Sequence, residues 1–300
     1  MPDSCLVVSC LIPMPDSSMN NNLDTANHDR DAVGKTYVYP VISRRAGGVS
    51  VGINLNPNNA CNWHCAYCQV PDLKRGSAPE INLELLRLEL TAMLDDLLHG
   101  SFMQERVPQG SRRLCDVAIS GNGEPTSCSS FDDVVAVIVE VMAQFDLTDT
   151  PLRLITNGSY VHKPHVQRGL ALMAKHHGEV WIKVDSVTDE GISRINGVTL
   201  DRTRLRQQVE APASQCPTWI QTCFVGWDGQ PPTEDEVSAY TVFLSELKQD
   251  AVPIRGVLLY GLARPSLQQE SLHLSMLDES WMKQAAELIQ QSGFEVRLSL

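Results

Sequence analysis

Six short apolar runs alternate with longer amphipathic segments through most of this 300-residue chain. The runs have the length of buried strands, and the segments between them have the length and periodicity of helices. A strand followed by a helix, repeated about six times, is typical of parallel strands joined by helical crossovers. The pattern predicts an α/β fold, either a complete or partial barrel or an open doubly wound sheet. The predicted strands are residues 51–55, 116–120, 152–156, 180–185, 219–225 and 254–260, and the predicted helices are residues 83–98, 131–145, 165–177, 202–210, 234–249 and 280–292.

The start of the chain differs in composition from the rest. Residues 14–34 are polar and rich in Asn, Asp and Ser, without helical periodicity or an alternating apolar pattern. Segments of this kind bury too little apolar surface to offset the chain entropy lost on folding. We expect a disordered leader over residues 1–36 and one folded domain over residues 37–300.

Charge and hydropathy narrow the class of protein. The sequence is 43% hydrophobic, and its formal net charge of −12 gives no overall attraction to nucleic acids or anionic membranes. No apolar run approaches the roughly 20 residues that cross a bilayer, and Asp3 stands where a secretion signal carries basic residues. We expect a cytoplasmic protein with no membrane partner.

Residues 35–75 are basic, in contrast to the acidic net charge of the whole chain. Between residues 35 and 75 there is a single acid, Asp72. Local positive charge can contact RNA phosphates even on an acidic protein, so RNA stays open as a partner. The basic residues of this stretch are Lys35, Arg44, Arg45, Lys74 and Arg75.

Three cysteines follow the first predicted strand. Cys61, Cys65 and Cys68 form a C-x3-C-x2-C pattern, and thiolates this close in sequence can converge on one metal centre. A structural zinc site usually takes four ligands in two separated pairs, and no second pair follows, although His64 adjoins Cys65. Three cysteines without a fourth suit a [4Fe–4S] cluster in which one iron atom is open to another ligand.

The cysteine spacing resembles the cluster-binding signature of the radical S-adenosylmethionine (SAM) superfamily, C-x3-C-x-aromatic-C, with Tyr67 as the aromatic residue. The segment SGNGEPT resembles the family's GGEP segment, whose backbone and Glu contact the amino group of the SAM methionine. The segment ITNGS resembles its TNG turn near the ribose. The SAM-binding residues that the resemblance implies are Tyr67, Gly121, Asn122, Gly123, Glu124, Pro125, Thr156 and Asn157.

This resemblance, from about Tyr37 onward, implies a fold, two cofactors and a chemistry. The fold is a partial (β/α)6 TIM-type barrel with its site at the carboxyl ends of the strands. The cofactors are a [4Fe–4S] cluster on Cys61, Cys65 and Cys68, and SAM on the open iron. An electron from a donor such as flavodoxin or ferredoxin splits SAM into methionine and a 5′-deoxyadenosyl radical, which abstracts hydrogen from the substrate.

Strand periodicity indicates which side chains line the chamber of such a barrel. Alternate residues share a face, so Lys183 lies with Asp185 in one predicted strand and Gln221 with Cys223 in the next. Two charges on one face are costly unless they are paired, hydrated or functional, and a structural ion pair is the simpler alternative. We predict Lys183, Asp185 and Cys223 as catalytic residues.

The substrate is left open by these motifs. The segments GNGEPT, KVDSVTDEGISRING, IQTCFV and LLYGLARP resemble the branch that contains the wyosine-type tRNA-modifying enzymes and their bacterial relatives. The archaeal and eukaryotic tRNA enzymes carry several cysteines ahead of the main motif, whereas only Cys5 and Cys10 precede it here, and Lys35 is the one upstream lysine. Arg255 and Arg264 are candidates for holding an anionic substrate group. The net charge slightly favours a small molecule or peptide as substrate, and a non-catalytic iron–sulfur carrier or sensor is the alternative from another class.

Overall fold

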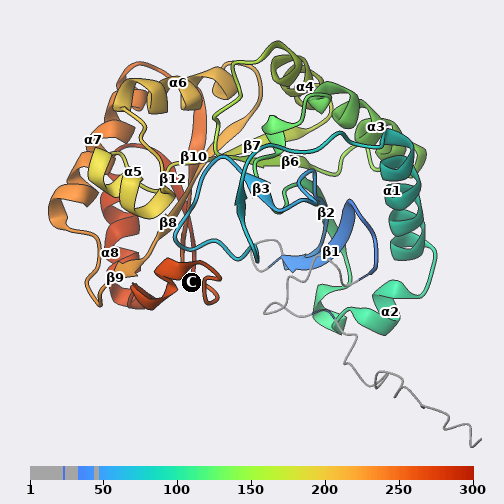
Figure 1. Cartoon of the computed structure of the whole chain (residues 1–300), viewed down its shortest axis with the longest axis horizontal. Helices are drawn as coiled ribbons and strands as arrows, with labels where there is room; N and C mark the ends of the chain where they lie inside the picture. The colour runs from blue at the N-terminus through green and yellow to red at the C-terminus, as the bar shows by residue number, and fades with distance from the viewer. Residues whose placement is uncertain (1–22, 24–32, 44–46) are drawn as a thin grey trace, which may run out of the picture.

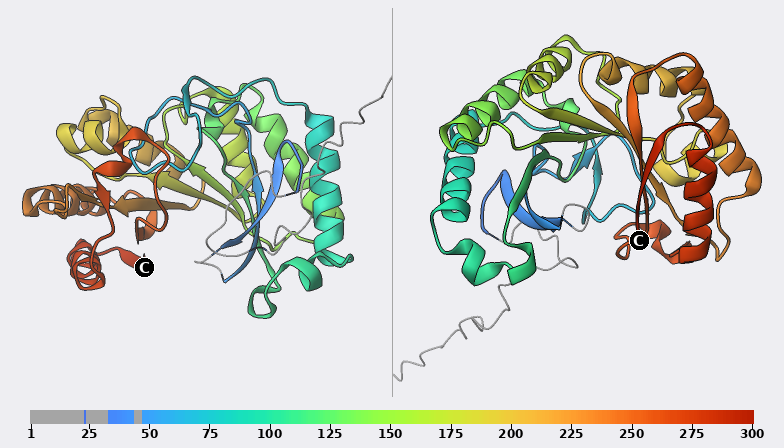
Figure 2. Two further views of the ribbon diagram at one scale, coloured as in Figure 1. Left: turned by 60° about the horizontal axis from the view of Figure 1, so that its bottom comes forward. Right: turned by 180° about the vertical axis from the view of Figure 1, so that it is seen from behind.

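The computed structural model describes residue 23 and the ranges 33–43 and 47–300. One eight-stranded sheet curls into the wall of a half-barrel, and the helices cover its outer side (Figure 1). Figure 2 shows the same open curl from two further directions. The strands of this sheet are β1 (Val38–Ser43), β2 (Gly48–Ile53), β5 (Leu114–Ile119), β6 (Leu152–Thr156), β7 (Gly178–Lys183), β8 (Thr218–Phe224), β10 (Ile254–Gly261) and β12 (Glu295–Ser299).

The strands lie in the order β1-β2-β5-β6-β7-β8-β10-β12. Neighbours from β2 to β12 pair in parallel, and β1 pairs with β2 in the antiparallel direction. Pro40 lies in β1 opposite Val51, and proline has no N–H to give a second neighbour, which suits an edge strand. Two small ladders join β3 (Ala60–Cys61) to β4 (Lys74–Arg75), and β9 (Gly226–Trp227) to β11 (Leu274–Ser275).

Helices link the parallel strands. Several begin at a side chain that accepts a backbone N–H, as Asn82 does from Leu85 and Thr233 from Glu236, which satisfies donors that a helix start leaves unpaired. No helix among the described residues combines the length and apolar composition needed to span a membrane. The α-helices are α1 (Leu83–Leu98), α2 (Phe102–Arg106), α3 (Phe131–Gln144), α4 (Pro164–Ala174), α5 (Asp189–Asn196), α6 (Arg202–Ala213), α7 (Glu234–Gln249) and α8 (Glu279–Gln290), and the 3-10 turns are Gln109–Ser111, Pro125–Ser127 and Gln269–Leu272.

The two faces of the sheet have different environments, as β7 illustrates. Val180 and Ile182 are fully buried in the apolar core. Trp181 and Lys183 alternate with them and line a cavity on the concave side. The period of two that places side chains on opposite faces of a strand therefore separates core from chamber.

The six predicted strands are the six central strands of the sheet, and the predicted half-barrel is confirmed. The sequence pattern missed both edge strands and the short helices α2 and α5. Strand β1 contains Pro40, which is unusual in a strand. Strand β12 alternates charged with apolar residues. Helix α5 has only eight residues, one of which is Gly191. Short edge elements carry too few periodic positions to be recognised.

Two parts of the expected leader pack against the domain. Leu23 is 6% exposed, and its N–H donates to the carbonyl of Arg106 over 2.8 Å. The N–H of Thr36 donates to Oε1 of Glu89 over 2.7 Å. Residues 1–22 and 24–32 of the leader, Cys5 and Cys10 among them, lie outside the described residues.

Candidate active site

The three cysteines of the motif lie in one loop after β2, at the carboxyl end of the parallel strands. Each is half-buried, and all three line a cavity of about 380 Å³ on the concave side of the sheet. Among the described residues, no three His, Cys, Asp or Glu side chains are grouped as ligands of one ion. The structure therefore brings the cysteines to a shared cavity and not to a single-ion site.

The end of α5 holds this cysteine loop, residues 61–68, through backbone hydrogen bonds. The N–H of His64 donates to the carbonyl of Asn196 over 3.0 Å. Gly197 follows at φ 63°, and a Cβ atom there would lie 2.6 Å from the carbonyl oxygen of His64. Only glycine permits both this left-handed conformation and this close approach, so the helix end and the loop are fixed against each other.

Residues 266–268 hold the other side of the loop. The hydroxyl of Ser266 donates to the carbonyl of Cys68 over 3.1 Å. The side-chain amide of Gln268 donates to the carbonyl of Val70 over 2.8 Å. Ser266 and Gln268 are both buried, so the cysteine loop is ordered by partners that lie far along the chain.

Arg75 supports the loop from a third direction. Its guanidinium donates to the carbonyl oxygens of Asn62 and, over 2.6 Å, of Gly197. The guanidinium of Arg75 therefore binds backbone carbonyl groups of the protein itself. Of the other basic residues that left RNA open as a partner, Lys74 is exposed, whereas Arg44 and Arg45 lie outside the described residues.

The GNGEP segment follows β5 and packs directly on the residues around the cysteines. A Cβ atom on Gly121 would lie 2.2 Å from Oδ1 of Asn54, and one on Gly123 would lie 2.0 Å from the carbonyl oxygen of Ala60. The N–H of Asn122 also donates to Oδ1 of Asn54 over 3.0 Å. The glycines are required because backbone approaches backbone here.

Glu124 is the buried carboxylate of this segment and is 2% exposed. Oε1 accepts bonds from the N–H of Thr126, over 3.0 Å, and from the hydroxyls of Thr126 and Thr156, and Oε2 accepts from the N–H of Asn157 over 2.7 Å. Burial raises the pKa of Glu124, and these donors act in the opposite direction. Together with Pro125, which opens a 3-10 turn, Glu124 ties the end of β5 to the end of β6. A direct contact of Glu124 with a ligand stays a prediction.

The predicted TNG turn also contacts the cysteine loop. The side-chain amide of Asn157 donates to Oδ1 of Asn62 over 2.9 Å. The indole N–H of Trp63 donates to the hydroxyl of Ser159 over 3.0 Å. Thr156 and Asn157 line the same cavity as the cysteines, so the three sequence motifs converge as predicted by their strand positions.

Lys183 is a cation inside this cavity. Nζ donates to the hydroxyl of Tyr260 over 3.0 Å and lies 5.0 Å from the centre of the Tyr67 ring. Burial lowers the pKa of Lys183, whereas the neighbouring Tyr260, Asp185 and Cys65 raise it by more, and the net shift is upward. The ammonium group therefore stays protonated, and its hydrogen bond goes to Tyr260 and not to Asp185.

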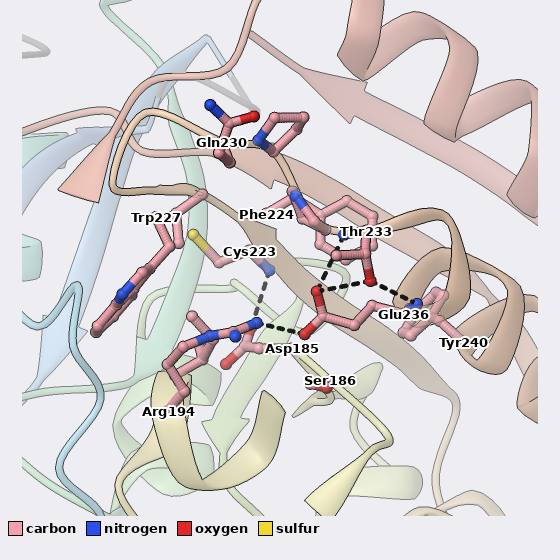
Figure 3. A pocket seen from close by; sticks show the side chains of 14 residues that line it. Asp185, Ser186, Arg194, Cys223, Phe224, Trp227, Gln230, Thr233, Glu236 and Tyr240 are labelled. Carbon is pink, nitrogen blue, oxygen red and sulfur yellow. Dashed lines mark hydrogen bonds and ion pairs between the residues drawn. The ribbon is translucent and has the colours of Figure 1, made fainter. Parts of the chain in front are cut away.

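Asp185 is held by three protein donors. It accepts bonds from the hydroxyl of Tyr67, from Nδ2 of Asn196 over 2.7 Å, and from the N–H of Cys223 over 2.8 Å. Figure 3 shows Asp185 beside Cys223 at a second cavity of about 140 Å³, which the ion pair of Arg194 with Glu236 borders. Cys223 lines both cavities, whereas Asp185 lines only the smaller one, so Cys223 lies between them.

Without a bound metal centre, the thiols of the cysteine loop do not readily lose their protons. Burial raises the pKa of Cys61 and of Cys65 to about 12. Glu124 raises the pKa of Cys61 further, whereas Lys183 lowers that of Cys65. A bound metal centre supplies the positive charge that makes buried thiolates favourable, so this donor set fits an iron–sulfur cluster.

The amino end of the chamber holds a charge cluster that sequence reasoning missed. Arg153 pairs with Asp116 and, over 3.2 Å, with Glu179, and its guanidinium lies 4.9 Å from the centre of the Trp181 ring. Asp116 also accepts a bond from the hydroxyl of Ser50. The available signal was a charged residue inside each of two apolar strands.

Other residues singled out from the sequence have mixed outcomes. Arg264 lines the large cavity, where Nη1 donates to Oε1 of Gln69 over 3.1 Å. Arg255 is exposed on β10, and Lys35 lies before β1 and outside the residues that line the cavity. Sequence reasoning also missed Asn196, because an Asn-Gly pair indicates a turn and not a buried amide.

No protein-family model matches this chain. Among curated proteins, GTPase Obg from Brachyspira hyodysenteriae is 28% identical over 133 residues, which are 44% of this chain and 17% of that protein. UPF0026 protein MJ1312 from Methanocaldococcus jannaschii is 30% identical over 158 residues, which are 52% of this chain and 42% of that protein. The chain matches less than half the length of either relative.

A nucleotide-binding P-loop is not formed by the Gly34-Lys35-Thr36 sequence. Such a loop has the pattern G-x4-G-K-[ST] and leads into a helix. Asp29 occupies the place of its first glycine, and strand β1 follows Thr36. The Gly34-Lys35-Thr36 sequence of this chain therefore does not form the phosphate-binding loop of a GTPase.

Solved structures resemble the fold over most of the chain. A radical SAM methyltransferase from Sphaerobacter thermophilus has a TM-score of 0.58 at 11% identity, covering 87% of this chain and 68% of that one. TYW1 with a lysine-pyruvate adduct bound has a TM-score of 0.51 at 15% identity, covering 81% and 73%. SuiB from Streptococcus suis bound to S-adenosylmethionine has a TM-score of 0.51 at 13% identity, covering 84% and 47%. With its curled parallel sheet and its cysteine loop at the carboxyl edge, this chain has the fold of the radical SAM enzymes.

Proposed function

We propose that this chain is a radical SAM enzyme that removes a hydrogen atom from a small molecule or peptide. One observation carries the proposal. The cysteine loop, the GNGEP segment and the TNG turn follow three neighbouring strands and line one cavity. That edge is where barrels of parallel strands hold their active sites.

The proposed cluster ligands are Cys61, Cys65 and Cys68, with the fourth iron left to SAM. When bound, the cluster would supply the electron that splits SAM into methionine and a 5′-deoxyadenosyl radical able to take hydrogen from the substrate. A flavodoxin or ferredoxin is the proposed electron donor. A cytoplasmic location fits this chemistry, because thiols stay reduced there.

The protein side of the proposed SAM site combines backbone and carboxylate groups. Glu124 is buried and bound only by neutral donors among the described residues, so its carboxylate would be available to pair with the positive amino group of SAM. Thr156 and Asn157 would meet the ribose side, and Tyr67 would offer its ring at the cysteine loop. Gly121, Asn122, Gly123 and Pro125 set the backbone of the GNGEP wall.

The chamber beyond this wall would position the substrate. Lys183 keeps its charge and can hold a carboxylate of SAM or of the substrate. Cys223 places a thiol between the two cavities, where it could donate hydrogen, and Asp185 fixes its backbone N–H. Exact positioning matters because a carbon radical attacks any C–H bond within reach.

Anaerobic reconstitution tests this function. The chain is incubated with iron and sulfide, then with dithionite and SAM, and 5′-deoxyadenosine is measured. We expect a four-iron cluster and SAM cleavage. A stable cluster without 5′-deoxyadenosine would instead identify a non-catalytic carrier or sensor, and absence of a cluster would overturn both.

Binding of tRNA at different salt concentrations tests the RNA alternative. Phosphate contacts release counterions, so binding should fall steeply with salt if RNA is the substrate. The matched variant neutralises Arg44, Arg45 and Lys74 and spares Arg75, which holds the cysteine loop. A salt slope reduced by roughly three contacts would support RNA, whereas no binding at low salt leaves the small-molecule or peptide substrate.

A further inference from the structure

The side chain of Asn196 bonds to a cysteine sulfur and to a carboxylate at the same time. It is 1% exposed. Nδ2 donates to Sγ of Cys65 over 3.5 Å and to Oδ2 of Asp185 over 2.7 Å. An amide nitrogen carries two hydrogens and no charge, so this one group can serve both acceptors.

The amide is held in one orientation by its surroundings. Asp185 is itself fixed by the hydroxyl of Tyr67 and the N–H of Cys223. The backbone carbonyl of Asn196 accepts from His64 in the cysteine loop, so the helix end cannot move away from Cys65. The hydrogen bond to sulfur is therefore a built feature of the site.

We propose that Asn196 is a positioning residue that holds a hydrogen bond on the sulfur of Cys65 and thereby raises the reduction potential of the cluster bound there. This inference rests on the proposed [4Fe–4S] cluster. Reduction adds one negative charge, part of which resides on the cysteine sulfurs. A donor to sulfur stabilises the reduced form, and hydrogen bonds to sulfur are among the factors that set cluster potentials.

The hydrogen bonds to the sulfur atoms of Cys61 and Cys65 come from different kinds of donor. Cys61 accepts a comparable bond over 3.5 Å from the backbone N–H of Trp63, which no substitution of a side chain removes. The donor to Cys65 comes from a side chain of another element. Asn196 is therefore a place where the sequence can tune the cluster without altering a ligand.

Redox titration of the reconstituted protein without SAM, followed by electron paramagnetic resonance, measures this effect. In Asn196→Leu, which is similar in size and has no donor, we expect the ratio of reduced to oxidised cluster at a given potential to fall about tenfold, a shift of about −59 mV for one electron. Asn196→Ala should shift in the same direction. Asn58→Leu is the matched control, because Asn58 in the same region donates to the carbonyl of Ser77 and not to sulfur.

The outcomes separate this inference from the proposed function. If the unmodified protein binds no four-iron cluster, the proposed function fails. If all variants bind the cluster at an unchanged potential, the role of Asn196 is overturned while the function stands. If both Asn196 variants lose the cluster and Asn58→Leu keeps it, Asn196 is needed for assembly and the tuning role is also overturned.

Discussion

Two buried carboxylates at opposite ends of the chamber have different kinds of partner. Glu124 at the carboxyl end and Asp116 at the amino end are each 2% exposed, and burial raises the pKa of both. Asp116 pairs with Arg153. Glu124, among the described residues, is bound by hydroxyls and backbone N–H groups and has no ion-pair partner.

This difference separates a charge that serves the fold from a charge that can serve a ligand. The field of a paired charge is largely cancelled by its partner, whereas the field of a carboxylate held by neutral dipoles is not cancelled by a counter-ion. The amino group of SAM is such a cation. The comparison therefore predicts ligand binding at the carboxyl end and structural support at the amino end, and four experiments test that division.

Cys65→Ala should have the largest effect, because it removes a proposed cluster ligand at the carboxyl end. We expect loss of the iron–sulfur absorbance and of 5′-deoxyadenosine formation, measured after anaerobic reconstitution. Unfolding in urea should change little, since the loop is held by its backbone. A variant that keeps the cluster and cleaves SAM would refute the ligand assignment.

Asp116→Ala should mainly destabilise the fold, because it leaves Arg153 without its most buried partner. Removing one partner of a buried pair costs about 3 kcal/mol or more. Urea unfolding measures this loss. Glu179→Ala is the control, because Glu179 is 30% exposed and its loss should cost less than about 1 kcal/mol. Equal losses of stability in the two variants would show that Asp116 and Arg153 do not act as a buried ion pair.

Glu124→Gln should mainly weaken SAM binding. A charge-assisted hydrogen bond is worth about 1.5 to 3 kcal/mol, so we expect affinity to fall by about one to two orders of magnitude. Equilibrium binding to the reconstituted protein gives this number, and the iron content should be unchanged. An unchanged affinity would show that Glu124 only connects β5 to β6. Its role would then be structural, like that of Asp116.

The stability difference between the native chain and Glu124→Gln should depend on pH. Because the pKa of Glu124 is raised in the folded state, folding favours the protonated carboxyl. The contribution of Glu124 is therefore complete below its ordinary value of 4.5 and declines as pH rises through the folded pKa, by at most about 1.4 kcal/mol per unit. Unfolding free energies of both proteins from about pH 4.5 to about pH 7 measure this. A difference that is flat or grows with pH would contradict the sign.

The sequence predicted the central sheet and the convergence of its motifs, because both depend on local patterns. The loop of Cys61 follows β2, Gly123 follows β5 and Asn157 directly follows β6, and parallel strands bring such segments to one edge. The supports of the cysteine loop could not be predicted in this way. Asn196 and Ser266 make contacts with residues far along the chain, and no periodicity indicates which distant amide or hydroxyl meets which carbonyl.

The attachment of Ser266 to the cysteine loop has a consequence for biosynthesis. Ser266 is 200 residues beyond Ala66, whose carbonyl its hydroxyl binds over 2.6 Å, and at translation rates of about 5 to 20 residues per second that separation corresponds to about 10 to 40 seconds. During this interval the nascent chain already displays Cys61, Cys65 and Cys68 without their C-terminal support. The contacts that order this side of the cysteine loop therefore form only after Ser266 and Gln268, in the last third of the chain, have been made.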